Sequence, residues 1–142
     1  MTIINELPMN IISVPQGWYI AHAIRADLNF STGLPATMDK VFDIGNRLEV
    51  IKEHFGITPG EVLQLGNLYN LIVKESSYDS PDREALADAL IELRDNLEGD
   101  GAKKLAMPRI CTGRNGLPWK DVLEMIDEAF DGMDILILIC VQ

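Results

Sequence analysis

Residues 107–119 read MPRICTGRNGLPW, and this stretch joins three kinds of local sequence that together indicate the fold. It begins in the apolar run 105–110, which is typical of a buried strand. A loop with Gly113 and Gly116 follows, and Pro118 then starts a helix whose apolar residues recur at helical spacing until Gly132. The predicted order is therefore strand, glycine loop, helix.

A second stretch upstream has the same plan. Residues 27–34 form a loop that follows the predicted strand 18–23 and ends where Pro35 starts a helix. A helix N-terminus exposes unpaired N–H groups and about half a positive charge, and a nearby glycine lets a phosphate approach the backbone. Two such loops favour a ligand diphosphate held from both sides; the alternative is that the glycines only cap strands. The absence of a Walker A motif excludes P-loop chemistry.

Strands and helices alternate along the rest of the chain. One predicted helix has Ser80 as its N-cap and Pro81 as its first residue and ends near Gly99; the helix from Pro35 breaks at Gly45 and resumes to Gly56. Further strands are predicted at residues 2–5, 62–65, 68–73 and 135–141. This order predicts one α/β domain over residues 1–142, with helices on both faces of the sheet.

Composition and charge limit the classes of function. The 142 residues carry 22 acidic and 12 basic side chains, a net charge of −10, which argues against non-specific binding to nucleic acid or to an anionic membrane. The two cysteines form no metal-binding motif, and the longest apolar run, 135–141, is too short to span a bilayer. The start of the chain lacks the features of a signal peptide. We expect a cytoplasmic monomer that needs no metal or cofactor.

Three side chains are candidates for chemistry. Lys74 ends a predicted strand and is either a solvated surface charge or an amine that attacks an electrophilic carbon. His22 lies within a predicted strand and is either a ligand contact or a buried, hydrogen-bonded residue. Cys111 is a possible nucleophile, although a small buried thiol is the commoner case.

The two loops resemble those of macro domains. The pattern Met107-Pro108-Arg109-Ile110-(x)2-Gly113-(x)2-Gly116-Leu117-(x)-Trp119 is similar to the second ligand loop of that family, in particular of the branch containing the terminal ADP-ribose protein glycohydrolases. Upstream, Ala21-His22-Ala23-Ile24-(x)2-Asp27 followed by Gly33-Leu34 resembles the first loop of the same branch. The strand that ends in Lys74 fits the segment that carries the branch's lysine.

This resemblance implies a three-layer α/β/α sandwich with a mixed central sheet and an ADP-ribose site across the strand ends. It implies an adenine contact at Glu6 and a diphosphate held by backbone N–H groups of both loops. The ligand-binding residues it suggests are Glu6, His22, Arg25, Asp27, Ser31, Thr32, Gly33, Leu34, Cys111, Thr112, Gly113 and Arg114.

The resemblance also implies a mechanism, from which this chain departs at one position. In the branch a lysine, here Lys74, attacks the anomeric carbon of the distal ribose, and an aspartate handles the proton; that aspartate position is Asn115. An amide cannot exchange a proton near neutral pH, and the loss of such a group typically lowers a rate by about 10²–10⁴-fold. Asp27, Glu75 and Asp79 are alternative proton-exchange groups.

Other departures add positive charge. Arg25 stands where the branch has a serine, and Arg25 and Arg114 are candidates for binding an extra anionic group. The leading hypothesis is a macro domain that binds ADP-ribose or a close derivative and hydrolyses an ADP-ribosyl ester through Lys74. The alternatives are a non-catalytic reader or sensor of ADP-ribose, a hydrolase of an ADP-ribose phosphoester, and a protein-interaction module.

Overall fold

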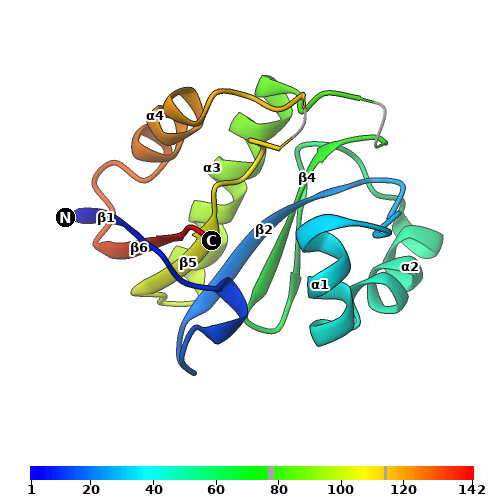
Figure 1. Ribbon diagram of the computed structural model, residues 1–142, viewed down its shortest axis with the longest axis horizontal. Coiled ribbons are helices and arrows are strands. Elements are labelled where there is room, and N and C mark those ends of the chain that lie inside the picture. Colours follow the sequence, from blue (N-terminus) through cyan, green and yellow to red (C-terminus); the bar gives the residue numbers. More distant parts are fainter. Residues whose placement is uncertain (77–78, 114) are drawn as a thin grey trace.

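The computed structural model describes residues 1–76, 79–113 and 115–142, and it has three layers (Figure 1). Six strands form one sheet in the order β1-β6-β5-β2-β4-β3. The strands are β1 (Thr2–Leu7), β2 (Tyr19–Arg25), β3 (Val62–Leu65), β4 (Leu68–Lys74), β5 (Lys104–Pro108) and β6 (Ile135–Cys140). Only the pair β3 and β4 is antiparallel, so the sheet is mixed, as predicted.

Helices cover both faces of this sheet. They are α1 (Gly33–Phe42), α2 (Ile44–Phe55), α3 (Arg83–Gly99) and α4 (Trp119–Ala129), with a short 3-10 helix η1 (Ile11–Ser13). One core lies between the sheet and α3 and α4, and includes Leu90, Leu105 and Phe130. A second core lies between the sheet and η1, α1 and α2, and includes Met38 and Ile72. The predicted three-layer α/β/α sandwich is confirmed.

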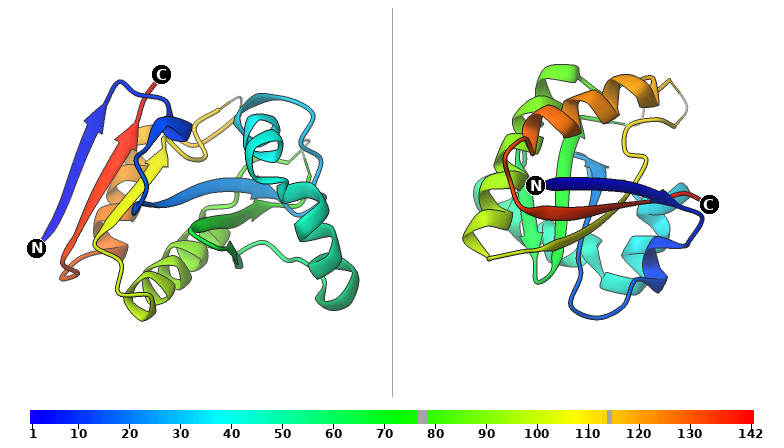
Figure 2. Two further views of the ribbon diagram at one scale, coloured as in Figure 1. Left: turned by 90° about the horizontal axis from the view of Figure 1, so that it is seen from below. Right: turned by 90° about the vertical axis from the view of Figure 1, so that its left-hand side faces the viewer.

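The carboxyl ends of the parallel strands form one edge of the sheet, where a ligand site is predicted. β1 and β6 run side by side in both views of Figure 2, and their ends lie at the same edge as those of β5, β2 and β4. In open α/β sheets, ligands bind outside the carboxyl ends of the strands. The loops that follow β2, β4 and β5 all begin at this edge.

Several predicted boundaries are wrong, and local hydrogen bonds explain two of the shifts. α3 begins at Arg83, not Pro81, because the Asp82 carboxylate accepts a hydrogen bond from the Glu84 N–H and acts as the N-cap. The break between α1 and α2 falls at Asp43, not Gly45: Asp43 adopts a left-handed conformation, and the Gly45 N–H donates to the Asp39 carboxylate.

The elements around both glycine loops also differ slightly from the prediction. α1 begins at Gly33, two residues before Pro35, and α4 begins at Trp119 with Pro118 as its N-cap. Proline suits the first turn of α1 because the N–H groups there have no partner within the helix. β5 ends at Pro108, not at residue 110, so the second loop begins two residues earlier.

Candidate functional site

The first loop connects β2 to α1 and is held to the end of β4. The Ala26 and Asp27 N–H groups donate to the Lys74 and Glu75 carbonyls, both at 2.9 Å. The Asp27 carboxylate then accepts from the Asn29 N–H at 3.0 Å, which turns the chain toward α1. Thr32 caps α1 without a side-chain hydrogen bond. The first N–H groups of α1, around Ser31 to Leu34, therefore suit an anionic ligand.

The second loop is a tight turn between β5 and α4. The Leu117 N–H donates to the Cys111 carbonyl at 2.7 Å, and the Gly116 N–H donates to the Gly113 carbonyl at 2.8 Å. Thr112 Oγ1 donates to the Arg109 carbonyl at 2.7 Å. Cys111 and Asn115 both have positive φ, a conformation that is uncommon outside glycine.

Gly116 is the position that this turn requires. A Cβ atom there would lie 2.4 Å from the Cys111 carbonyl oxygen and 2.8 Å from the Gly113 carbonyl oxygen. Cys111, Thr112, Gly113 and Asn115 thus have defined positions at the edge, whereas the candidate Arg114 lies outside the described residues. Asn115 is exposed, so its amide is available to a ligand or to water.

Lys74, at the end of β4, lies near Cys111 of the second loop. Lys74 is half-buried at the end of β4. Burial raises the pKa of the Cys111 thiol to about 12, and the nearby positive charge of Lys74 acts in the opposite direction. The thiol is therefore protonated at neutral pH, which argues against Cys111 as the nucleophile. Lys74 remains the nucleophile candidate at this edge.

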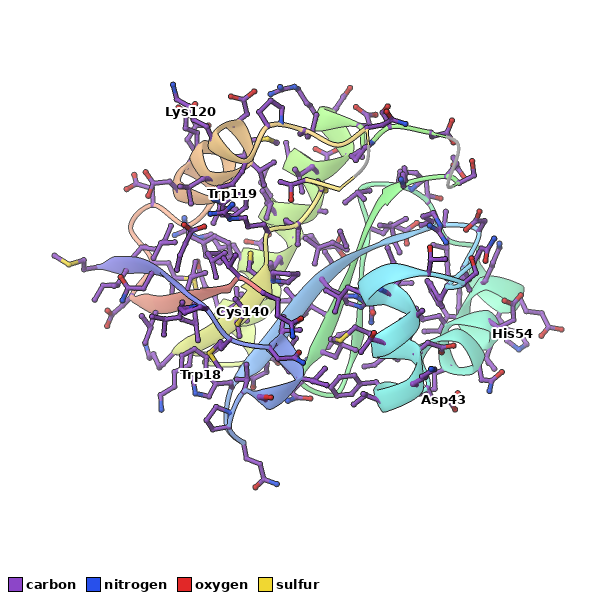
Figure 3. The ribbon with its side chains drawn as sticks, viewed as in Figure 1. Trp18, Asp43, His54, Trp119, Lys120 and Cys140 are labelled. Carbon is purple, nitrogen blue, oxygen red and sulfur yellow. The ribbon has the colours of Figure 1, made fainter. Side chains whose placement is uncertain are left out.

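A cavity of about 300 Å³ lies at the ends of β5 and β6, beside η1 and the start of α1. Ligand pockets are commonly of about this size or larger, and are mainly apolar with a few polar groups. Cys140, which lines it, lies between α4 and α1 in Figure 3. Its lining residues are Met9, Ile11, Leu34, Pro108, Arg109, Cys140, Val141 and Gln142. Of these, the sequence predicted only Leu34 as a ligand contact. Pro108 and Arg109 lie in the motif of the second loop but were not predicted as contacts, and the remaining lining residues come from separate segments.

Glu6 borders this cavity through Arg109. Arg109 Nε and Nη2 donate to the two Glu6 carboxylate oxygens at 3.0 and 3.2 Å, and the Arg109 guanidinium lies 5.5 Å from the Trp119 ring centre. The hydrogen bond from Arg109 is the main reason that the pKa of Glu6 lies below its usual value. Glu6 is thus a paired carboxylate at the end of β1, and its predicted adenine contact stays a prediction.

His22 lies in the interior of the sheet, away from the strand ends. It is fully buried, and its Nε2 atom is 2.6 Å from Asn70 Oδ1, while Asn70 Nδ2 donates to the Leu63 carbonyl. Since a strand rises about 3.3 Å per residue, His22 lies about 10 Å from the end of β2 at Arg25. This placement favours the structural alternative for His22.

Arg25 and Asp27 follow one another at the end of β2. Arg25 Nε lies 3.5 Å from Asp27 Oδ1, and the two side chains are 15% and 34% exposed. Arg25 is in register with Lys74 on β4, across an irregularity in the pairing. Arg25, Asp27 and Lys74 therefore stand together at one point of the edge.

Other classes of site find no support in the part of the chain that the structure describes. No group of His, Cys, Asp and Glu side chains there could hold a metal ion. None of the helices found in that part is long and apolar enough to cross a membrane.

The chain is an α/β/α protein whose candidate site residues gather at the carboxyl ends of its parallel strands. The family model described as "Macro domain" matches residues 48–126, which is more than half of the chain. The protein therefore belongs to the macro domain family.

Known relatives agree with this assignment. The chain is 29% identical over 134 residues to human "ADP-ribose glycohydrolase OARD1", which covers 92% of this chain and 86% of the relative. The macrodomain of Thermus aquaticus DarG has a similar fold, with a TM-score of 0.84, 16% identity and 99% of each chain covered. Thermosipho africanus DarTG in complex with ADP-ribose superposes with a TM-score of 0.83 and 13% identity, over 99% of this chain and 42% of that one.

Proposed function

We propose that this protein binds ADP-ribose across the strand ends and hydrolyses an ADP-ribosyl ester through Lys74. The observation that carries the proposal is that an apolar cavity and a lysine lie at one edge of the sheet with two glycine loops between them. The relatives support it: OARD1 is named an ADP-ribose glycohydrolase, and the DarTG structure contains ADP-ribose.

The spacing of the strands suits a long ligand with two different ends. From β6 at the cavity to β4 at Lys74 there are three strand-to-strand steps, or about 14 Å at about 4.8 Å per step. We place the adenine in the cavity, the diphosphate at the N–H groups of the two loops, and the distal ribose beside Lys74. Glu6, through its contact with Arg109, would border the adenine.

The proposed chemistry uses Lys74 as a nucleophile. Its neutral amine forms a bond to the anomeric carbon of the distal ribose, and the bond from that carbon to the ester oxygen breaks. The released carboxylate keeps the electron pair, the new ammonium loses a proton to water, and a water molecule then hydrolyses the adduct and frees the amine. Asn115 can orient that water, but cannot exchange a proton with it near neutral pH. Asp27 is a nearby carboxylate at the end of β2.

The second candidate function is a reader that binds ADP-ribose without changing it. Asn115 favours this alternative, because the resembled branch has an aspartate at this position. The two functions share the cavity and the loops and differ only in what happens at Lys74.

Calorimetry with ADP-ribose, ADP and AMP, followed by a hydrolysis assay on a glutamate-linked ADP-ribosyl peptide, tests both. We expect micromolar binding of ADP-ribose, about −8 kcal/mol, and release of the peptide by the wild type. Lys74→Ala should abolish release and keep most of the affinity. Lys120→Ala is the matched control, since Lys120 extends outward from α4 in Figure 3. Binding without release by the wild type would favour the reader, and absence of binding would refute both functions.

The remaining expectations belong to the same proposal. We infer a cytoplasmic monomer without affinity for non-specific nucleic acid, consistent with the net charge of −10. Light scattering after size exclusion tests the oligomeric state. Fluorescence anisotropy with a random DNA duplex tests the absence of nucleic-acid binding.

A further inference from the structure

Arg25 has buried donor atoms for which the described part of the chain provides no hydrogen bond. Its Nε and Nη2 atoms are both buried and unpartnered there, although only 15% of the side chain is exposed. The Asp27 carboxylate is nearby, with Oδ1 at 3.5 Å from Nε, but does not accept a hydrogen bond from it. Unmet buried donors destabilise a fold, and more so when they are charged. Such a cost indicates a function for the side chain.

Nε and Nη2 lie on the same edge of a guanidinium group. In arginine side chains generally, this edge can donate two parallel hydrogen bonds to two oxygens of one anion. Arg109 shows this use in the same molecule, because its Nε and Nη2 atoms donate to the two oxygens of Glu6 at 3.0 and 3.2 Å. Two parallel N–H···O bonds of this kind are short, strong and specific for carboxylate or phosphate. Arg25 presents the same pair of donors, but within the described residues neither atom donates a hydrogen bond, although the Asp27 carboxylate lies 3.5 Å from Nε.

Arg25 also stands where the proposed reaction releases an anion. It is the register partner of Lys74, and the Ala26 N–H donates to the Lys74 carbonyl at 2.9 Å. Adjacent strands lie about 4.8 Å apart, so the two side chains start from neighbouring points of the edge. Because Lys74 attacks as a neutral amine, Arg25 supplies the positive charge beside the position proposed for the distal ribose, and the Asp27 carboxylate lies 3.5 Å from its Nε atom.

We propose that Arg25 binds the carboxyl or phosphate group attached to the anomeric carbon of the distal ribose, and binds it through two oxygens once that group leaves as an anion. This inference rests on the proposed binding of ADP-ribose. In the ester substrate the group is held through its carbonyl oxygen, and in the phosphoester through two of its free phosphate oxygens. As the bond to the anomeric carbon breaks, the electron pair passes to the leaving group, and Arg25 binds the resulting charge over two oxygens.

The same contact explains how the chain can do without an acid at position 115. A carboxylate or phosphate leaving group that is bound by a guanidinium departs as an anion and needs no proton. Ester and phosphoester linkages can then be hydrolysed with an asparagine, which supplies no proton, at position 115. From a serine-linked ADP-ribose, the serine side chain would leave as a one-oxygen alkoxide, which needs a proton and cannot accept from both donors. Arg25 therefore predicts a preference for ester and phosphoester linkages over serine linkages.

A binding experiment tests the contact without relying on turnover. Calorimetry compares ADP-ribose with ADP-ribose that carries a phosphate on the distal anomeric carbon, using the wild type, Arg25→Ala and Arg47→Ala. Each of the three proteins also carries Lys74→Ala, so that neither ligand is hydrolysed during the titration. Arg47 is exposed on α2 and donates to the Phe42 carbonyl, so it is a control away from the site. We expect the phosphorylated ligand to bind at least about tenfold more tightly, equivalent to about 1.4 kcal/mol, except when Arg25 is replaced.

A kinetic experiment distinguishes the carboxylate from the phosphate as the natural anion. The glutamate-linked, distal-phosphate and serine-linked substrates are compared in the wild type and in Arg25→Ala. Arg25→Ala should lower kcat about 100-fold on whichever anionic linkage is natural, with ADP-ribose affinity within about threefold of wild type. Added guanidinium ions should restore part of the rate, which they would not do for a purely structural arginine.

The outcomes separate this inference from the proposed function. Equal affinity of the wild type for the two ligands, or an equal loss of both in Arg25→Ala, would overturn the role of Arg25 while ADP-ribose binding stands. If the wild type binds no ADP-ribose, the proposed function fails and this inference fails with it. If the wild type binds but does not hydrolyse, the tenfold preference in calorimetry still decides the role of Arg25.

Discussion

His22 makes the stability of the fold depend on pH. Burial lowers the pKa of His22 to about 4 from 6.5, and the hydrogen bond with Asn70 only partly opposes this. The unfolded chain takes up a proton near pH 6.5, and the folded chain does so only near pH 4. Above pH 6.5 the free energy of unfolding is therefore unaffected by this group. As pH falls from 6.5 to about 4, the free energy of unfolding drops by up to about 1.4 kcal/mol per pH unit.

Urea denaturation at pH 8, 6 and 5 measures this effect. His22→Gln should reduce the loss of stability between pH 8 and pH 5, whereas His54→Gln, at an exposed position of α2, should show the wild-type loss. Parallel profiles for the wild type and His22→Gln would show that His22 does not titrate as described.

Gly116 is the residue on which the second loop depends. Its substitution by alanine would place a Cβ atom 2.4 Å from the Cys111 carbonyl oxygen, a contact with backbone that can be relieved only by moving the loop. We expect Gly116→Ala to lower the free energy of unfolding by about 1–3 kcal/mol and to weaken ADP-ribose binding. Thermal unfolding and calorimetry measure the two effects.

Gly113→Ala is the matched control for stability in the same loop, because no atom of the described residues lies within 4 Å of a Cβ atom there. Equal stabilities of the two alanine variants would mean that the loop does not have the tight conformation described.

At the scale of secondary structure, the N-cap of α3 provides a direct test of the structure against the sequence. The sequence favours Ser80, whereas the structure has the Asp82 carboxylate accepting from the Glu84 N–H at 3.0 Å. Asp82→Ala should therefore lower the free energy of unfolding by about 1 kcal/mol, and Ser80→Ala should have little effect. Urea denaturation of both variants at pH 7 decides between them, and a larger loss in Ser80→Ala would favour the sequence-based position.

Sequence reasoning identified the elements better than their ends. The order of strands and helices follows from apolar periodicity and from prolines and glycines, which act locally. The break at Asp43 depends on the Asp39 carboxylate binding the Gly45 N–H, a contact between side chain and backbone that periodicity cannot indicate. The same holds for α3, where Ser80 and Asp82, two residues apart, are both good N-caps.

At the scale of the whole molecule, the loops were predictable and the cavity was not. The motifs around Gly33 and Gly113 lie in continuous stretches, so the sequence alone indicated them. The cavity combines Met9 and Ile11 with Val141 and Gln142, which the pairing of β1 with β6 brings together from the two ends of the chain. Similarly, the burial of His22 depends on Asn70 of the neighbouring strand, which no local pattern specifies.

The cavity and Lys74 should act on the two ends of one ligand, and a substitution in the cavity tests this. Val141→Trp places a large ring in a space of about 300 Å³. It should weaken ADP-ribose and AMP to a similar extent, by about tenfold or 1.4 kcal/mol, because both ligands carry the adenine. Lys74→Ala should leave AMP unaffected, since AMP lacks the distal ribose. Calorimetry of both ligands with both variants makes the comparison.

Ile91→Trp is the control, because Ile91 is 57% exposed on α3, across the sheet from η1 and α1. If Val141→Trp weakens ADP-ribose but not AMP, the adenine lies elsewhere, and the direction of the ligand along the strand ends is the reverse of the one proposed.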